Sequence, residues 1–289
     1  MSAVTTPGIA YQGEPGAYGE EAALAYFGDG RVQPVDLPTF SAVCRAVVEG
    51  RAAAAVLPLE NSIAGTVGEA VDALIRSDLA VVGELLLPVR HQLLGVPGAG
   101  LAQVRRVASH RQALAQCQDF LAGRGWQLVV ADDTAGAARQ LAESRDGGSA
   151  VIASERAAER YGLEVLARDI HDAPTNLTRF VVVGRRTGSH APRPAGPLAP
   201  PSSAAPTCLI AFETRHVAGA LHEALGAFAA AGVNLSRIES RPTGRARWEY
   251  RFLVSVDGHH AREPLRSVLS ALRRSAHAVR VLGSFPSAG

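Results

Sequence analysis

The segment "RRTGSHAPRPAGPLAPPSSAAP" (residues 185–206) decides how this 289-residue chain is organised. It is dense in Pro, Ala, Gly and Ser and has no hydrophobic period, which is typical of a semi-rigid, partly polyproline linker. A linker over residues 186–206 separates a long N-terminal part from a short C-terminal part. We therefore expect two domains, at residues 8–185 and 207–289.

The residues before the linker alternate between strand-like and helix-like patterns. Short apolar runs predict strands, among them residues 8–12, 52–57 and 180–183, and the runs between them predict helices. This alternation favours an α/β fold with parallel sheets that are covered by helices on both faces. In such sheets, ligands bind beyond the carboxyl ends of the strands, where helices begin.

The residues after the linker follow a different plan. The predicted order is strand, helix, strand, strand, helix and strand, at residues 207–212, 216–231, 234–241, 248–256, 264–274 and 278–282. This βαββαβ order is that of the ferredoxin-like fold, with both helices on one face of one sheet. A free sheet edge or helix face would favour pairing with another copy of the chain.

Composition excludes several classes of function. The 29 basic residues, all Arg and none Lys, are balanced by 27 acidic residues, so nucleic acid is not expected as a partner. The absence of Lys excludes lysine Schiff-base and P-loop chemistry. The three cysteines are far apart and predict reduced thiols, and we expect neither a metal nor a cofactor. No secretory signal and no membrane span are evident, so a cytoplasmic location is expected.

Three polar turns before predicted helices could together form an anion site. They are "QGEPGAYGEE" (residues 12–21), "PLENSIAGTVGEA" (residues 58–70) and "ASHRQAL" (residues 108–114). The first amides of a helix are unpaired and carry about half a positive charge. Three such ends around one cleft favour a small carboxylate as ligand. Each turn also has a local explanation, such as a helix cap at Ser109 or a strained backbone relieved by Gly65.

The segment "NLTRF" (residues 176–180) places polar side chains at the start of a buried strand. Alternation along a strand predicts that Thr178 and Phe180 share one face and that Arg179 points to the other. A guanidinium next to a buried strand needs a carboxylate partner, from the protein or from a ligand. The pattern fits either a cleft residue beside an anchor, or a purely structural strand start.

Six motifs, in order along the chain, resemble those of monofunctional prephenate dehydratases with a C-terminal ACT regulatory domain. The motifs are "GEPGAY", "PLENSIAG", "SHRQALAQC", "NLTRF", "GALHEALGAF" and "NLSRIESRP". The resemblance covers nearly the whole chain. It implies a two-lobed, periplasmic-binding-protein-like catalytic domain followed by a ferredoxin-like ACT domain. Lobe 1 would hold residues 8–87 and 168–185, and lobe 2 would hold residues 88–167.

The resemblance implies decarboxylating dehydration of prephenate to phenylpyruvate in L-phenylalanine biosynthesis. Thr178, at the floor of the cleft, would hydrogen-bond to the departing hydroxyl. Arg179 would hold either a substrate carboxylate or a protein acid such as Glu60. The remaining catalytic and substrate-binding candidates are Asn176, Gly16, Ala17, Asn61, Ser62, Gly65, Ser109, His110 and Gln112.

The resemblance also implies feedback inhibition by phenylalanine, bound where two ACT domains meet in a homodimer or homotetramer. Binding would shift the opening of the cleft through the linker. The effector-site candidates are Gly219, Ala220, Leu221, Asn234, Glu239, Ser240, Arg241 and Pro242.

Two positions depart from the family pattern, and two other functions stay open. Gly19 stands where the family usually has Ser or Thr, and Arg111 stands where it usually has Pro. Neither departure removes Thr178, so we expect activity to be retained. The alternatives are an arogenate dehydratase, which would act on the amino counterpart of prephenate, and a non-catalytic amino-acid sensor.

Overall fold

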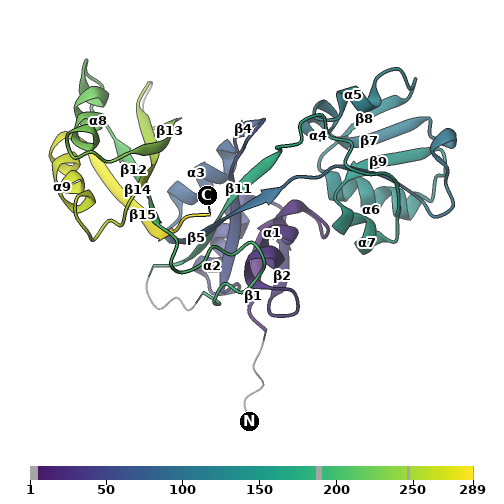
Figure 1. The fold of residues 1–289 in the computed structure, drawn as a ribbon, viewed down its shortest axis with the longest axis horizontal. Helices are drawn as coiled ribbons and strands as arrows, with labels where there is room; N and C mark the ends of the chain where they lie inside the picture. Colours follow the sequence, from purple (N-terminus) through teal and green to yellow (C-terminus); the bar gives the residue numbers. More distant parts are fainter. Residues whose placement is uncertain (1–5, 187–190, 246–247, 289) are drawn as a thin grey trace, which may run out of the picture.

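The computed structural model describes residues 6–186, 191–245 and 248–288. Figure 1 shows three α/β units in a row, each built on its own sheet, with the N-terminal unit in the middle. We call the middle unit lobe 1, the unit at the right lobe 2, and the unit at the left the C-terminal domain. Within the described ranges, no helix is long and apolar enough to span a lipid bilayer.

Lobe 1 is built on a sheet with strand order β2-β1-β3-β11-β5, and the short strand β4 pairs with β3. Its elements are β1 (Gly8–Gln12), α1 (Tyr18–Phe27), β2 (Gln33–Leu37), α2 (Phe40–Val48), β3 (Ala54–Asn61), β4 (Gly65–Thr66), α3 (Gly68–Arg76), β5 (Leu79–Pro88) and β11 (Leu177–Arg185). The expected all-parallel sheet is wrong. β1 is parallel to β2 and β3, but β11 returns from lobe 2 and lies antiparallel between β3 and β5.

Lobe 2 has a five-stranded sheet of order β10-β6-β9-β7-β8, which is also mixed. Its elements are β6 (Gln92–Gly95), the 3-10 helix η1 (Leu101–Gln103), β7 (Arg106–His110), α4 (Arg111–Ala115), α5 (Gln118–Leu121), β8 (Gln127–Ala131), α6 (Thr134–Ser144), β9 (Ser149–Ala153), α7 (Glu155–Tyr161) and β10 (Glu164–Ala167). The chain enters this lobe through residues 89–91 and leaves it through residues 168–176. These two crossings lie at the base of the space between the lobes.

The C-terminal domain has the βαββαβ order that its sequence predicts. Its elements are β12 (Pro206–Glu213), α8 (Ala220–Ala230), β13 (Leu235–Pro242), β14 (Tyr250–Asp257), α9 (Leu265–Ser275) and β15 (Ala278–Pro286). The strands form an antiparallel sheet of order β13-β14-β12-β15. Both helices pack on one face, against a core that includes Cys208, Ile210, Val254 and Phe228.

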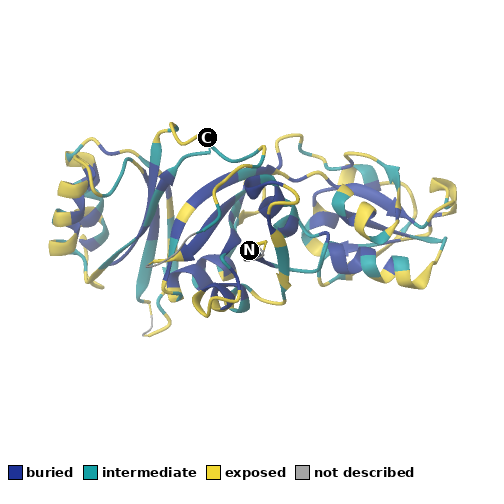
Figure 2. Ribbon diagram, turned by 90° about the horizontal axis from the view of Figure 1, so that it is seen from below, coloured by how far each residue is buried: buried dark blue, intermediate teal, exposed yellow. Residues whose placement is uncertain are grey.

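The other face of this sheet packs against lobe 1. Leu209, Leu253 and Leu282 belong to the same buried cluster as Val81 of β5, and Figure 2 shows buried segments continuing across the junction. At the closest point, a Cβ added to Gly283 of β15 would meet the carbonyl oxygen of Val81 at 2.0 Å. Lobe 1 therefore occupies the face of the sheet that the two helices leave uncovered.

Replacing Gly283 with Ala should destabilise this junction. The new methyl group would overlap the backbone of Val81, so β15 and β5 must move apart, at a cost of about 1–3 kcal/mol. Thermal unfolding should show a lower midpoint. Gly226→Ala is the matched control, because Gly226 lies inside α8 with open space around it, and the substitution should stabilise that helix by up to about 1 kcal/mol. An unchanged midpoint for Gly283→Ala would contradict the close packing.

The described part of the linker is fastened to lobe 1. The backbone amides of Ala195 and Gly196 donate to the carbonyl oxygen of Tyr26 at 3.1 and 2.9 Å, and that of Leu198 donates to Ala25 at 3.0 Å. The side chain of Leu198 packs against the core beneath α1. The described part of the linker thus runs along α1, a contact that its composition does not predict.

Candidate active site

A cavity of about 430 Å³ lies between the two lobes, within the range of about 300–1,000 Å³ that is typical of small-molecule sites. Five helices, α1, α2, α3, α4 and α6, begin at its wall. The residues at these starts that line the cavity are Ala17, Tyr18, Thr39, Phe40, Val67, Glu69, His110, Gln112, Asp133 and Thr134. The three turns predicted to meet do so, and α2 and α6 join them.

The helices differ in whether a side chain caps their first backbone amides. Thr39 and Asp133 cap α2 and α6 with their side chains, whereas α1 and α3 begin at Ala17 and Val67 without a side-chain cap. No Arg side chain is among the described residues that line the cavity. An anionic ligand in this cleft would therefore depend mainly on backbone amides, and α1 and α3 offer theirs most freely.

The hydroxyl of Thr178 is oriented by Asn61, which lies directly opposite it across the β3–β11 ladder. The Oδ1 atom of Asn61 accepts the backbone N–H groups of Ile63 and Ala64 at 3.1 and 2.9 Å. The other amide atom of Asn61 must then be the nitrogen, which donates to Thr178 Oγ1 at 3.0 Å. Because Thr178 accepts this bond, its own proton is left to point into the cleft.

The same reasoning fixes a chain of buried polar groups behind Asn61. Asn61 Nδ2 also donates to Asn176 Oδ1 at 2.7 Å, and Asn176 Nδ2 donates to Gln116 Oε1 at 3.1 Å. The side-chain oxygen of Gln116, Oε1, can only accept a hydrogen bond. The Nε2 atom of His91, which lies 2.8 Å from it, therefore carries a proton. The hydroxyl of Tyr18 lies 3.0 Å from the other ring nitrogen of His91.

Burial lowers the pKa of His91, which keeps its ring neutral at pH 7. The neutral ring donates from Nε2 to Gln116, and its Nδ1 atom is left as an acceptor beside the Tyr18 hydroxyl, which also donates to Arg90 O at 2.9 Å. The chain of hydrogen bonds links α1, both crossings between the lobes, α4 and the end of β3. It holds Thr178 as a hydrogen-bond donor from both lobes at once.

The predicted substrate-site residues separate into two groups. Those that line the cavity are Ala17, Asn61, His110, Gln112 and Thr178. The others lie outside its lining: Gly16, Glu60, Ser62, Gly65, Ser109, Asn176 and Arg179. The hydroxyl of Ser109 already donates to Ile152 O at 2.6 Å, and that of Ser62 donates to Thr175 O at 2.9 Å. Ser109 thus joins β7 to β9, Ser62 joins the turn after β3 to the crossing between the lobes, and contact of either residue with a substrate stays a prediction.

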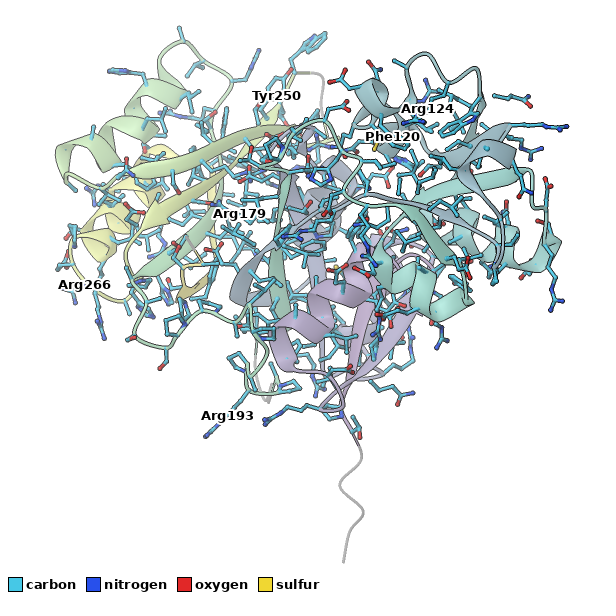
Figure 3. All side chains as sticks on the ribbon, turned by 45° about the vertical axis from the view of Figure 1, so that its right-hand side comes forward. Phe120, Arg124, Arg179, Arg193, Tyr250 and Arg266 are labelled. Carbon is cyan, nitrogen blue, oxygen red and sulfur yellow. The ribbon has the colours of Figure 1, made fainter. Side chains whose placement is uncertain are left out.

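Arg179 points away from the cleft, on the opposite face of β11 from Thr178 and Phe180, as alternation predicts. Its Nη1 atom lies 3.3 Å from Glu60 Oε1, and its Nε atom lies 3.9 Å from Glu84 Oε2. Figure 3 places Arg179 between lobe 1 and the C-terminal domain. Its partners are therefore protein acids, and Glu60 is one of them.

The turn "GEPGAY" is held by lobe 2. The hydroxyl of Ser154 donates to Gly16 O at 2.7 Å, that of Tyr161 donates to Pro15 O at 2.8 Å, and Arg156 forms a salt bridge with Glu20 at 3.0 Å. Gly16 has a φ of 91°, and an added Cβ would lie 2.9 Å from the Cα atom of Ala157. Gly16 thus permits close contact between the lobes, which fixes the width of the cleft.

Glu21 of α1 faces a small hollow against α7, lined by Arg156, Glu155 and Glu159. The pKa of Glu21 is raised from 4.5 to about 7, mainly by burial; Arg156 opposes this rise, and the negative charges of Glu155 and Glu159 add to it. The folded state thus holds this proton more tightly than the unfolded state. The stability that results is present in full below about pH 4.5 and is lost as the pH rises through about 7.

Glu21→Gln should therefore raise the midpoint of thermal unfolding near pH 8 and leave it almost unchanged near pH 4. The amide keeps the shape of the protonated acid but carries no charge to bury. The measurement is Tm against pH for both proteins, with Glu159→Gln as a control on the exposed side of the same hollow. A gap between the two curves that does not widen with pH would contradict the raised pKa.

Gly19 and Arg111, which depart from the family pattern, have different surroundings. A Cβ at Gly19 would lie 3.1 Å from Tyr11 Cδ2 and 3.3 Å from Gln12 O, so α1 packs here too closely on β1 for an easy Ser or Thr. Arg111 is exposed and is not part of the cavity lining.

The predicted effector residues lie on two sides of the C-terminal domain. Ala220 and Leu221 line a hollow of about 360 Å³ together with Trp248 and Tyr250, and Gly219 begins α8 with a φ of 82°. Glu239 and Arg241 face lobe 1 instead: Thr66 donates to Glu239 at 2.7 Å, and Arg241 pairs with Asp72 at 3.1 Å. Asn234 bonds to Asp257, and Ser240 and Pro242 are exposed.

Three polar residues of the cleft were not predicted: the buried His91 and Gln116, and the half-buried Tyr18. Tyr18 and Gln116 lie inside quoted motifs, "GEPGAY" and "SHRQALAQC", where their spacing alone gives no role. His91 lies in the crossing between two strands and belongs to no motif. The signal that could have marked it is a histidine between two apolar strands, a position that requires polar partners.

The fold and the cleft define the class: a two-lobed α/β protein with a cavity of small-molecule size between its lobes and a ferredoxin-like C-terminal domain. Residues 9–188 match the family model described as prephenate dehydratase, and residues 209–274 match the one described as ACT domain. The chain therefore belongs to the prephenate dehydratase family and is a dehydratase with a C-terminal ACT domain.

Full-length relatives agree with this assignment. Arogenate dehydratase/prephenate dehydratase 2 of Arabidopsis thaliana chloroplasts is 38% identical over 287 residues, which cover 96% of this chain and 72% of that protein. A bifunctional N-acyl-homoserine lactone acylase/prephenate dehydratase of Komagataeibacter europaeus is 38% identical, with 96% and 95% covered. The crystal structure of the Arthrobacter aurescens prephenate dehydratase in complex with L-Phe has a TM-score of 0.86 at 32% identity, with 97% and 90% covered.

Proposed function

We propose that this chain converts prephenate to phenylpyruvate, water and carbon dioxide, and that Thr178 assists the departure of the ring hydroxyl. The observation that carries the proposal is the hydrogen bond in which Asn61 donates to Thr178. It leaves the proton of Thr178 facing the cavity, where a leaving hydroxyl needs a donor. Residues 8–185 would form the catalytic domain, residues 186–206 the linker and residues 207–289 the regulatory domain.

In this mechanism the two carboxylates of prephenate bind to backbone amides at the starts of α1 and α3, beside Ala17 and Val67. The C–O bond to the ring hydroxyl breaks as that oxygen accepts a hydrogen bond from Thr178, and it leaves as water after taking up a proton. The C–C bond to the ring carboxylate breaks at the opposite carbon, its electron pair enters the ring, and carbon dioxide departs. The ring becomes aromatic, so the enzyme mainly needs to orient the substrate.

The other cleft residues have supporting roles. Asn61 aims the hydroxyl of Thr178, and Asn176 and Gln116 hold Asn61. His110 and Gln112 lie at the start of α4, where they would contact the substrate. Arg179 and Glu60 would act as positioning residues, since both face the ACT domain.

Phenylalanine, the end product of the pathway, would inhibit the enzyme by feedback. The relative whose structure is described as a complex with L-Phe supports L-Phe as a ligand of such a protein. Gly219, Ala220 and Leu221 would lie at the ligand, in a homodimer or homotetramer in which two ACT domains meet. The cytoplasm is the expected location for such a biosynthetic step.

A turnover assay on prephenate and on arogenate, with and without phenylalanine, tests the proposal. We expect phenylpyruvate from prephenate and a lower rate with phenylalanine. A higher kcat/KM on arogenate would favour the arogenate dehydratase, whose name the Arabidopsis relative shares. No turnover of either, together with stabilisation by phenylalanine, would favour a sensor.

Lactone acylase activity, which the name of the Komagataeibacter relative includes, deserves a parallel assay. Such chemistry needs a nucleophile activated by a base. Among the cleft residues that the structure describes, no Ser, Thr or Cys is hydrogen-bonded to a histidine; Thr178 is bonded to Asn61 instead. The geometry of the cleft thus favours the dehydratase.

A further inference from the structure

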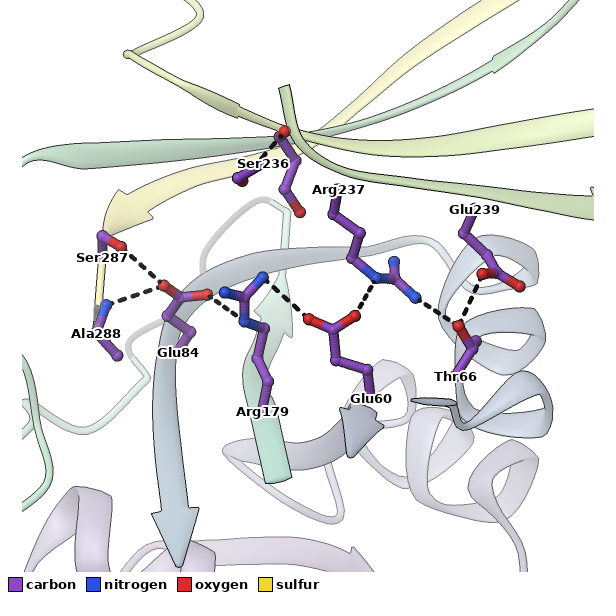
Figure 4. Close-up of polar contacts among 10 residues, drawn as sticks. Glu60, Thr66, Glu84, Arg179, Ser236, Arg237, Glu239, Ser287 and Ala288 are labelled. Atoms are coloured by element: carbon purple, nitrogen blue, oxygen red, sulfur yellow. Dashed lines mark hydrogen bonds and ion pairs between the residues drawn. The ribbon is translucent and has the colours of Figure 1, made fainter. Parts of the chain in front are cut away.

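A line of polar side chains joins the edge strand of the ACT domain to the strand that carries Thr178 (Figure 4). Its members, in spatial order, are Glu84, Arg179, Glu60, Arg237, Thr66 and Glu239. Arg237 and Glu239 belong to β13 of the ACT domain, and the others belong to lobe 1. The two domains therefore share one continuous set of ion pairs and hydrogen bonds.

Glu60 is the centre of this line, because each of its oxygens has a partner on a different domain. Its Oε1 atom lies 3.3 Å from Arg179 Nη1, and its Oε2 atom accepts from Arg237 Nε at 2.7 Å. Arg237 Nη2 lies 3.2 Å from Thr66 Oγ1, and the hydroxyl of Thr66 donates to Glu239 at 2.7 Å. A movement of β13 would act directly on the carboxylate of Glu60.

Glu60 and Arg179 are next to the two residues that set the donor in the cleft. Across the β3–β11 ladder Thr178 lies opposite Asn61, and Arg179 lies opposite Glu60. Consecutive side chains of a strand point to opposite faces, so one pair faces the cleft and the next pair faces the ACT domain. The ladder has a register shift between Arg179 and Phe180, so its regular hydrogen bonding is interrupted at this position.

A small displacement of β13 would also disturb the pairing of these side chains. The side chain of Arg237 is only 5% exposed, and its buried Nη1 atom has no hydrogen-bond partner in the protein. The Nε atom of Arg179 is likewise buried without a hydrogen-bond partner. Removing one member of a buried ion pair leaves an uncompensated charge, so a small shift of β13 would force the line to pair differently.

Building on the proposed function, we propose that Arg237 is a positioning residue for the dehydration and that this line carries the phenylalanine signal from β13 to Thr178. It replaces the linker as the route between the domains. When phenylalanine moves β13, Arg237 pulls on Glu60, and the paired ends of β3 and β11 turn Asn61 and Thr178 away from the donor geometry. Coupling between the phenylalanine site and the cleft then depends on the ion pair between Arg237 and Glu60.

The test compares the wild type with Arg237→Gln, Arg237→Lys and Arg280→Gln. Arg280 is the matched control, because it also crosses the same junction but binds backbone carbonyls, Ile75 O and Leu79 O, at 2.9 and 3.0 Å. We expect Arg237→Gln to lower kcat by about tenfold at an unchanged KM, and Arg237→Lys to restore part of it. The change in kcat/KM that phenylalanine causes, about five-fold or more for allosteric enzymes, should vanish in Arg237→Gln and persist in Arg280→Gln.

Two further measurements separate this inference from the proposed function. Calorimetry should give the same Kd for phenylalanine in the wild type and in Arg237→Gln. Amide hydrogen exchange needs no turnover, and phenylalanine should alter it at residues 61–64 and 175–178 in the wild type but not in Arg237→Gln. If the wild type turns over neither prephenate nor arogenate, the proposed function fails, and the exchange result still decides the inference.

Four results would overturn the inference. The first is an Arg237→Gln variant that keeps the wild-type kcat and the wild-type response to phenylalanine. The second is loss of phenylalanine binding in that variant, which would make Arg237 an effector ligand. The third is an equal loss in Arg280→Gln, which would assign the effect to the whole junction. The fourth is a wild type whose exchange at residues 61–64 and 175–178 does not respond to phenylalanine.

Discussion

Thr178→Val should lower the kcat for prephenate by about 10²–10⁴-fold, the usual contribution of a positioned proton or hydrogen-bond donor. Valine has the shape of threonine and suits a strand, so β11 should keep its packing against β3 and β5. The side chain of Asn61 loses one acceptor but keeps Asn176 Oδ1 and Leu177 O. The substitution therefore removes only the hydroxyl that faces the cleft.

The control for this prediction is Thr178→Ser, which keeps the hydroxyl and removes only a methyl group. It should retain activity within about tenfold of the wild type, because Asn61 can still donate to the serine oxygen. Steady-state kinetics on prephenate and thermal unfolding should be measured for both variants. A valine variant that is folded and fully active would exclude Thr178 from the reaction.

Most of the fold could be predicted from local patterns. The strand at β1, the helix at α3 and the βαββαβ order of the ACT domain follow from apolar spacing and turn residues. The strands and helices predicted before residue 52 do not include α2, although its signal is present, with a capping Thr39 before an apolar stripe. β2 and β10 are short and only partly buried, so their identity depends on the neighbouring strands and not on their own sequences.

Errors at helix ends have causes that lie outside the helix. The run "QALAQCQDFLA" (residues 112–122) by itself predicts one helix, but α4 and α5 are separate. The carboxylate of Asp172 accepts the backbone amides of Gln118 and Asp119 at 2.9 and 3.1 Å, so a distant residue starts α5. In the ACT domain, α8 begins four residues later than expected, because Gly219 has a left-handed conformation just before it.

In the candidate site, too, features that depend on adjacent residues could be predicted, and contacts between residues far apart in the chain could not. Alternation along β11 predicted that Thr178 and Arg179 face opposite sides, because this depends on three adjacent residues. For Arg179 the sequence left open a substrate carboxylate or a protein acid such as Glu60; it could not decide between them or indicate Glu84, because both acids reach Arg179 from other strands. The roles of His91 and Gln116 also depend on contacts between residues that are far apart in the chain.

Asn61→Asp should reduce kcat nearly as much as Thr178→Val, by about 10²-fold or more, although it leaves the hydroxyl of Thr178 in place. The substitution exchanges the donor Nδ2 for a carboxylate oxygen, while the other oxygen still accepts from Ile63 and Ala64. Thr178 must then donate to this carboxylate instead of accepting from an amide. Its proton turns away from the cleft, and the leaving hydroxyl loses its donor.

The added negative charge needs its own control, because the substrate is a dianion. Gln112→Glu places a carboxylate in the same cavity without touching Thr178, so it should raise KM through repulsion while kcat falls far less. Kinetics on prephenate for both variants separate the two effects. If Asn61→Asp raises KM but keeps kcat, the added negative charge alone would explain the effect of the substitution. A large fall in kcat, absent from Gln112→Glu, would show that the direction of one proton, and not merely the presence of a hydroxyl, decides the rate.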